Sequence, residues 1–142
     1  MIQNIGIVGS GQMGAGIAHV AALADRNVVL LDVNEAVLNK ALEAIERNIQ
    51  RQVSRGKLED GAAERALKRI TITTDYSDFN VADLVIEAAT ENEGIKRKIF
   101  ETLVPNLSKE ALIASNTSSI SITRLASTTD RPGKFIGMHF FN

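Results

Sequence analysis

Apolar residues follow two patterns along this chain. Uninterrupted apolar runs are typical of strands buried on both faces of a sheet, and they occupy residues 2–8, 28–32, 70–74, 84–88, 111–114 and 135–141. Between these runs, apolar residues recur every three or four positions, which is the spacing of one face of a helix. We therefore expect strands and helices to alternate.

The helical spacing is clearest in residues 35–53, where one apolar face is formed by Leu38, Leu42, Ile45, Ile49 and Val53. Gly56 is expected to end this helix. Shorter helices are expected at residues 14–24, 61–68, 95–103 and 122–126. This order of elements predicts a doubly wound α/β fold of Rossmann type, with a mainly parallel sheet and a helical excursion after the second strand.

The composition narrows the possible functions. The 142 residues suit one domain, and a net charge of −1 gives no global field that would attract nucleic acid or a membrane. The lack of cysteine excludes disulfides and thiolate metal sites, and two histidines are too few for a histidine-rich metal cluster. No apolar stretch approaches the roughly 20 residues that cross a bilayer, and the first run is too short for a signal peptide. We expect a cytoplasmic protein.

A glycine-rich turn follows the first predicted strand. Gly9, Gly11 and Gly14 have the spacing G-x-G-x-x-G between a strand and a helix. In this pattern Gly9 permits a tight turn, Gly11 lets a pyrophosphate approach the main chain, and Gly14 permits close packing of the helix on the strand. The helix N-terminus would offer free N–H groups to the phosphates. The glycines alone are also compatible with a tight connection that binds nothing.

Asp32 strengthens the case for a dinucleotide. It ends the second predicted strand, 21 residues after Gly11, where a carboxylate can accept the ribose hydroxyls of an adenosine. The same carboxylate would repel a 2′-phosphate, and no lysine or arginine follows before Lys40. The sequence therefore predicts NAD rather than NADP as the cofactor.

Polar side chains follow the other predicted strands at the edge where doubly wound sheets bind ligands. They are Glu87 and Glu91, then residues 115–119, and finally residues 139–142. His139 is the candidate for proton transfer, because a free imidazole side chain titrates near working pH. Other interpretations remain open: a structural histidine, a loop that caps the next helix, and for Glu91 an acid at a helix N-terminus. His19 is expected to be structural or exposed, without a catalytic role.

Four segments, GIVGSGQMGAGIA, VIEAATEN, SNTSSISIT and GMHFFN, in this order and spacing, resemble the 3-hydroxyacyl-CoA dehydrogenase family. The shorter bacterial 3-hydroxybutyryl-CoA dehydrogenases are the best fit. The resemblance covers the whole chain, and its last two segments are the specific ones. It implies an NAD-dependent oxidoreductase of fatty acid metabolism.

The resemblance also implies a role for each matching residue. At the pyrophosphate and the adenine ribose it places Gly9, Ser10, Gly11, Gln12, Met13, Gly14 and Asp32. Glu91 and Lys96 would approach the ribose on the nicotinamide side, and Asn142 would lie beside the nicotinamide. Ser118 would touch both the cofactor and the substrate hydroxyl.

The implied reaction is the oxidation of a (3S)-3-hydroxyacyl-CoA to a 3-oxoacyl-CoA, and its reverse. His139 would take the proton of the C3 hydroxyl while a hydride passes from C3 to the nicotinamide. Ser118 would orient the hydroxyl oxygen. The cofactor supplies the redox chemistry and the protein supplies placement and proton transfer.

The resemblance ends where the sequence does. Family members continue with a proline after the residue matching Asn142, with a glutamate about a dozen residues past the histidine that orients the imidazole, and with a helical domain that completes the acyl pocket and forms a homodimer. We therefore expect residues 1–142 to be the dinucleotide-binding domain alone, a natural or engineered fragment with little turnover by itself.

Two other functions stay open at this point. A noncatalytic NAD(H)-binding or redox-sensing module would use the same scaffold without needing His139. Another β-hydroxyacid dehydrogenase would carry a catalytic lysine on a second domain. The GMHFFN segment argues against both, because neither needs a histidine at this strand end.

Three arginines of the long helix form a row. Arg47, Arg51 and Arg55 recur every four residues and so share one face. Such a row could hold the phosphates of coenzyme A, the expected acyl carrier. A solvated face paired with Glu43 and Glu46 is the favoured interpretation.

Overall fold

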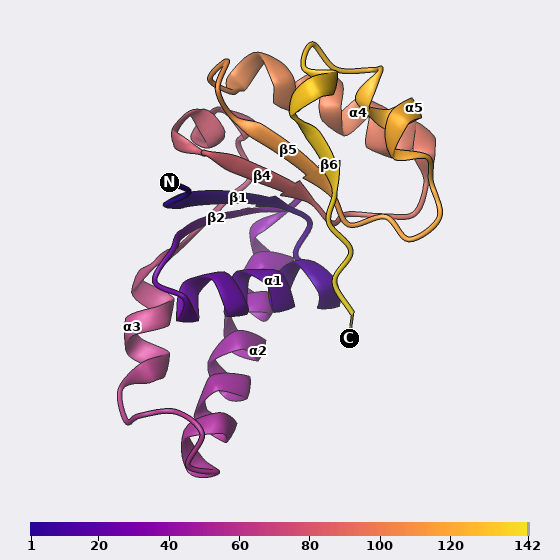
Figure 1. Ribbon diagram of the computed structural model, residues 1–142. Helices are drawn as coiled ribbons and strands as arrows, with labels where there is room; N and C mark the ends of the chain where they lie inside the picture. Colours follow the sequence, from indigo (N-terminus) through magenta and orange to yellow (C-terminus); the bar gives the residue numbers. More distant parts are fainter. Residues whose placement is uncertain (142) are drawn as a thin grey trace.

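Six parallel strands form one sheet in the computed structural model, which describes residues 1–141 (Figure 1). The strands are β1 (Asn4–Val8), β2 (Asn27–Leu31), β3 (Ile70–Thr73), β4 (Leu84–Glu87), β5 (Leu112–Ser115) and β6 (Phe135–Gly137). Their order across the sheet is β3-β2-β1-β4-β5-β6. Strand order reverses at β1 and β4, so a ligand crevice is expected outside the carboxyl ends of these two strands. The predicted doubly wound Rossmann fold is confirmed.

Helices cover both faces of the sheet. They are α1 (Gln12–Leu23), α2 (Glu35–Ser54), α3 (Ala62–Lys68), α4 (Glu93–Leu103) and α5 (Ile122–Ala126). In Figure 1, α1, α2 and α3 lie on one face, and α4 and α5 lie on the other. Three short 3₁₀ helices complete the chain: η1 (Tyr76–Val81), η2 (Val104–Asn106) and η3 (Pro132–Lys134).

Each face of the sheet has its own apolar core. Ile7 of β1 belongs to the core under α1 and α2, whereas the next residue, Val8, belongs to the core under α4 and α5. Successive side chains of a strand point to opposite faces. A strand covered on both faces therefore has to be apolar throughout, which explains the uninterrupted runs in the sequence.

The long helix α2 forms as its sequence predicts. The side chain of Asn34 caps its N-terminus by accepting a hydrogen bond of 3.0 Å from the Val37 amide. Its buried residues recur at helical spacing: Leu38, Ala41, Ile45 and Ile49. The helix ends at Ser54, and Gly56 follows with φ +74°, a conformation that suits glycine.

One predicted strand is too long. We expected residues 135–141 to form the last strand, but β6 ends at Gly137. Its partner β5 ends at Ser115, and the Met138 amide still donates a 2.9 Å hydrogen bond to the Ser115 carbonyl. Beyond that point the described chain forms no further main-chain hydrogen bonds between β5 and β6. His139 therefore follows the last strand instead of lying in it.

Candidate functional site

The glycine-rich turn between β1 and α1 has a different geometry at each glycine. Gly9 has φ +102°, and a Cβ there would lie 2.7 Å from the Ala88 carbonyl oxygen. A Cβ on Gly14 would collide with the Gly9 carbonyl oxygen. A Cβ on Gly11 would meet no atom within 4 Å. Gly9 and Gly14 thus allow the turn to close, and Gly11 presents an open stretch of main chain.

The N-terminus of α1 is left open to an anion. Gly11 is its N-cap residue, no side chain caps it, and its first turn holds no acidic residue. By contrast, side chains cap α2, α4 and α5 through Asn34, Asn92 and Ser121. The first N–H groups of a helix lack partners within the helix and carry a partial positive charge. At α1 these groups remain available for a phosphate.

Asp32, just after β2, holds the glycine-rich turn. Its Oδ2 accepts hydrogen bonds from the Ser10 amide at 2.7 Å and from the Ser10 hydroxyl at 2.6 Å. Its Oδ1 accepts one from the Val33 amide at 2.7 Å. An ionised carboxylate offers about four acceptor positions, so the group keeps capacity for a ribose hydroxyl. The sequence predicted Asp32 as a ribose ligand but gave no sign of its bonds to Ser10.

A buried ion pair lies at the carboxyl end of β4. Lys96 Nζ lies 2.6 Å from Glu87 Oε1, and the two side chains are 1% and 0% exposed. The Ser115 hydroxyl donates to the same Oε1 at 2.7 Å, and the Ala89 amide donates to Oε2 at 2.9 Å. Glu87 therefore joins the ends of β4 and β5 to α4. Sequence reasoning placed Glu87 at this edge but missed its partner, although a carboxylate that ends a buried strand requires one.

Glu91 joins the loop after β5 to the start of α4. Its Oε2 accepts hydrogen bonds from the Ser119 hydroxyl at 2.8 Å and the Thr117 hydroxyl at 3.0 Å. Burial raises the pKa of Glu91, but these hydrogen bonds and the charge of Lys96 outweigh it, so the pKa lies below its ordinary value. Ser118, between the two donors, is exposed.

These elements surround a cleft of about 270 Å³ outside the ends of β1 and β4. Nine residues line it: Gly11, Gln12, Met13, Ala88, Ala89, Thr90, Glu91, Lys96 and Asn116. Five of them are site residues predicted from the sequence. Asp32 is bonded to the same turn through Ser10, whereas Ser118 and His139 do not line the cleft. Asn116 was not singled out by sequence reasoning.

His139 is exposed beyond β6. Its ring centroid lies 4.5 Å from that of Phe141, with the ring planes 59° apart. Phe140 and Phe141 line a second hollow of about 380 Å³ with Gln12 and Met13. The two hollows thus meet at the first turn of α1. The predicted nicotinamide ligand Asn142 lies outside the described residues.

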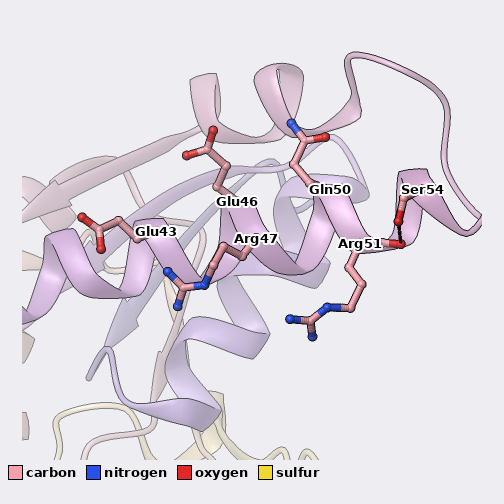
Figure 2. A pocket seen from close by; sticks show the side chains of 6 residues that line it. All are labelled: Glu43, Glu46, Arg47, Gln50, Arg51 and Ser54. Atoms are coloured by element: carbon pink, nitrogen blue, oxygen red, sulfur yellow. Dashed lines mark hydrogen bonds between the residues drawn. The ribbon is translucent and has the colours of Figure 1, made fainter.

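Two of the three arginines, Arg47 and Arg51, are exposed residues of α2 (Figure 2). Arg47 and Arg51 project from the same side of the helix and line a shallow surface hollow with Glu43, Glu46 and Gln50. Arg55 caps the helix C-terminus and is exposed. Within residues 1–141 no ion pair joins these arginines to Glu43 or Glu46, so the expected pairing is wrong.

The other histidine has a structural contact. His19 Nε2 lies 2.9 Å from Gln52 Oε1 and so links α1 to α2. In the described part of the chain no three His, Asp or Glu side chains gather as metal ligands. The helices of that same part are too short or too polar to cross a bilayer.

Residues 4–142 match the family described as 3-hydroxyacyl-CoA dehydrogenase, NAD binding domain. The chain is 51% identical to the 3-hydroxybutyryl-CoA dehydrogenase of Bradyrhizobium diazoefficiens, covering 100% of this chain and 48% of that protein. It is 47% identical to a probable 3-hydroxybutyryl-CoA dehydrogenase of Deinococcus radiodurans, covering 98% and 50%. The crystal structure of (S)-3-hydroxybutyryl-CoA dehydrogenase from Ralstonia eutropha matches with a TM-score of 0.97 and 44% identity, over 100% of this chain and 50% of that one.

The chain therefore spans about half the length of the curated relatives it matches. The match to the family covers nearly all of the chain, and the fold, the glycine-rich turn and the strand-end cleft agree with it. It also decides against another β-hydroxyacid dehydrogenase. This chain belongs to the NAD-binding domain family of the 3-hydroxyacyl-CoA dehydrogenases.

Proposed function

We propose that this domain supplies the cofactor half of an enzyme that interconverts (3S)-3-hydroxyacyl-CoA and 3-oxoacyl-CoA. The observation that carries the proposal is the uncapped N-terminus of α1, which opens beside the bare main chain of Gly11 into the strand-end cleft. A 3-hydroxybutyryl-CoA substrate is part of the same proposal, suggested by the relatives' names. A homodimeric full-length protein and a cytoplasmic location complete it, as the family resemblance implies.

The residues of the cleft suit NAD. Ser10, Gly11, Gln12 and Met13 would hold the pyrophosphate with main-chain N–H groups. Asp32 would accept the adenine ribose hydroxyls, and its charge would repel the 2′-phosphate of NADP. Nothing cationic follows it before Lys40. This distribution of charge supports NAD as the preferred cofactor.

The nicotinamide half of the cofactor would lie toward Glu91 and Lys96, with Ser118 and Asn142 nearby. NAD supplies a hydride acceptor at its nicotinamide ring. Ser118 would orient the C3 hydroxyl of the substrate, and His139 would accept the hydroxyl proton as the hydride leaves C3. In the reverse direction His139 would return that proton to the oxygen.

The acyl-CoA would need contacts that residues 1–141 supply only in part. Arg47 and Arg51 are exposed, unpaired by Glu43 and Glu46, and point to one side of α2 (Figure 2). Together with Arg55 they are our candidates for the CoA phosphates. The glutamate that would orient His139 and the acyl pocket are expected in the other half of a longer protein.

Calorimetry with the 142-residue chain tests the cofactor site. NADH should bind more tightly than NADPH. Asp32→Ala should weaken NADH binding about tenfold, the scale of a lost hydrogen bond to a charged group. It should also reduce the ratio of NADH affinity to NADPH affinity. If NADH gave no binding heat, or if Asp32→Ala left its affinity unchanged, the proposal would fail.

A fusion to the second half of the Bradyrhizobium relative tests catalysis. It should reduce acetoacetyl-CoA with NADH, whereas the 142-residue chain alone should show little turnover. His139→Ala should abolish that activity and leave NADH affinity unchanged, and His19→Ala serves as the matched control. A fusion that binds NADH but keeps its rate without His139 would contradict the proposed base. A fusion that binds NADH without turnover would favour a noncatalytic module.

A further inference from the structure

We propose that Asn116 is a positioning residue for His139, an inference that rests on the function proposed above. The main chain on either side of His139 is held by one short loop. On the N-terminal side the Met138 amide donates to the Ser115 carbonyl at 2.9 Å. On the C-terminal side the Phe140 amide donates to Asn116 Oδ1 at 2.7 Å.

The hydrogen bond from the Phe140 amide to Asn116 Oδ1 takes the place of a main-chain hydrogen bond between strands. β5 ends at Ser115 and β6 at Gly137, and within residues 1–141 the Phe140 amide donates to no main-chain carbonyl. The Asn116 side chain supplies the acceptor from the position after Ser115. The orientation of its amide is fixed by chemistry, because a main-chain N–H can only donate and so requires the oxygen.

Asn116 is itself held firmly. Its main-chain amide donates to the Glu87 carbonyl at 2.9 Å, which ties it to the end of β4. The side chains of Glu87, Lys96 and Ser115 form the buried network next to it. Asn116 Oδ1 therefore connects the end of β4 to a segment that lies beyond the last strand.

His139 depends on these two anchors. Its side chain is exposed, and within residues 1–141 no hydrogen bond to its ring is formed; its aromatic contact is with the exposed ring of Phe141. With so little to fix the ring directly, its place is set by the main chain on both sides. Loss of the Phe140 anchor would leave His139 held only from Met138.

Asn116 also connects this segment to the cofactor cleft. It lines the cleft with Gly11 and Lys96 and lies two residues before Ser118. One residue thus fixes the main chain of the proposed base from the loop that carries the proposed substrate-orienting serine. We therefore expect Asn116 to affect the rate of turnover.

Amide hydrogen exchange by NMR on the 142-residue chain tests the anchor without any ligand. The Phe140 amide should be protected in the wild-type chain, and Asn116→Ala should lower its protection by about tenfold or more. Asn116→Asp keeps an acceptor at the same place and should keep the protection. Asn106→Ala is the matched control, because it removes a 2.9 Å side-chain bond to the Thr102 carbonyl far from the site. Unchanged protection in Asn116→Ala would overturn the proposal.

Turnover at saturating NADH in the fusion protein tests the consequence for catalysis. Asn116→Ala should lower kcat about tenfold or more, and Asn116→Asp should recover much of the loss. A kcat within about twofold of the wild-type value, despite lost Phe140 protection, would overturn the positioning role. A wild-type fusion without turnover would overturn the proposed function instead, while the exchange of Phe140 still decides whether the anchor exists.

Discussion

Glu87 and Lys96 form a buried ion pair beside the cleft, with Nζ 2.6 Å from Oε1 and side-chain exposures of 0% and 1%. Taking two charges out of water costs free energy that their attraction regains only with good geometry and further hydrogen bonds. Ser115 and Ala89 provide those bonds to the carboxylate. The two buried charges therefore compensate each other, and removing one of them should destabilise the fold.

We expect Lys96→Met to lower the free energy of unfolding by about 3–5 kcal/mol, because it leaves the Glu87 carboxylate buried without its cation. The double variant Glu87→Leu/Lys96→Met should regain most of that loss, since two apolar groups bury without this penalty. Urea denaturation measures both. A double variant no more stable than Lys96→Met would show that the network does more than neutralise charge.

Lys68→Met is the control for this measurement. Lys68 pairs with Glu64 at 3.2 Å, but the two side chains are 73% and 74% exposed. A pair in contact with solvent contributes at most about 1 kcal/mol. The stability of Lys68→Met should stay close to that of the wild-type chain.

The first helix offers a second test with an internal control. A Cβ on Gly14 would collide with the Gly9 carbonyl oxygen, whereas one on Gly16 would meet nothing within 4 Å. Gly14→Ala should therefore destabilise the chain by about 1–3 kcal/mol or more and weaken NADH binding by displacing the turn. Gly16→Ala should stabilise it by about 0.5–1 kcal/mol, because alanine loses less entropy in a helix. Thermal unfolding and calorimetry report the two effects, and a Gly14→Ala chain as stable as Gly16→Ala would contradict the packing described here.

Glu91 makes stability depend on pH in acid. Although burial raises its pKa, hydrogen bonds from Ser119 and Thr117 and the charge of Lys96 bring the pKa below the ordinary 4.5. A carboxyl with a depressed folded-state pKa stabilises the fold above its unfolded pKa, and this contribution is lost as the pH falls through the folded-state value. Glu91→Gln should therefore be less stable than the wild-type chain at neutral pH, and the difference should disappear on acidification below 4.5.

Urea denaturation at a series of pH values, from neutral pH to below 4.5, measures the difference in stability between Glu91→Gln and the wild-type chain. Glu46→Gln changes an exposed residue of α2 (Figure 2) and so controls for the loss of one surface carboxylate. A Glu91→Gln deficit that persists unchanged into acid would mean that the carboxylate charge does not contribute, and that only the shape of the side chain does.

The fold was predictable because it depends on local patterns. The alternation of Ile7 and Val8 between two cores forces apolar runs, and the amphipathic spacing of α2 survives unchanged in the structure. The last strand was not predictable from its residues. Ile136, Met138 and Phe140 continue the apolar composition, but strand length is set by the partner, and β5 stops at Ser115.

The candidate site also has a part that the sequence predicted and a part that it did not. The glycine-rich turn and Asp32 carry a motif with fixed spacing, so they could be located in the sequence. Ser10 and Asp32 lie 22 positions apart in the sequence, and Asn116 and Phe140 lie 24 apart. No local sequence pattern predicts hydrogen bonds between residues so far apart. Glu87 was recognisable as a strand-end carboxylate, but which cation would neutralise it depended on how α4 packs against β4.

The arginine row gives the last prediction. Arg51 is exposed on the side of α2 that it shares with Arg47 (Figure 2), and among the described residues it forms no ion pair with Glu43 or Glu46. If this face holds CoA phosphates, Arg51→Glu should weaken CoA binding about tenfold or more, the scale of a charge-assisted hydrogen bond to phosphate, and should leave NADH affinity unchanged. Lys40→Glu makes the same change in charge on another part of α2, so it separates a local contact from a general electrostatic effect.

Calorimetry with CoA and with dephospho-CoA would show which phosphate is involved. A contact to the 3′-phosphate makes Arg51→Glu costly for CoA and nearly neutral for dephospho-CoA, whereas a contact to the pyrophosphate affects both ligands alike. Either contact should weaken with added salt, because the arginines are in solvent. Equal CoA affinity in Arg51→Glu and Lys40→Glu would exclude this face as the phosphate site, and the arginine row would then be an ordinary solvated surface.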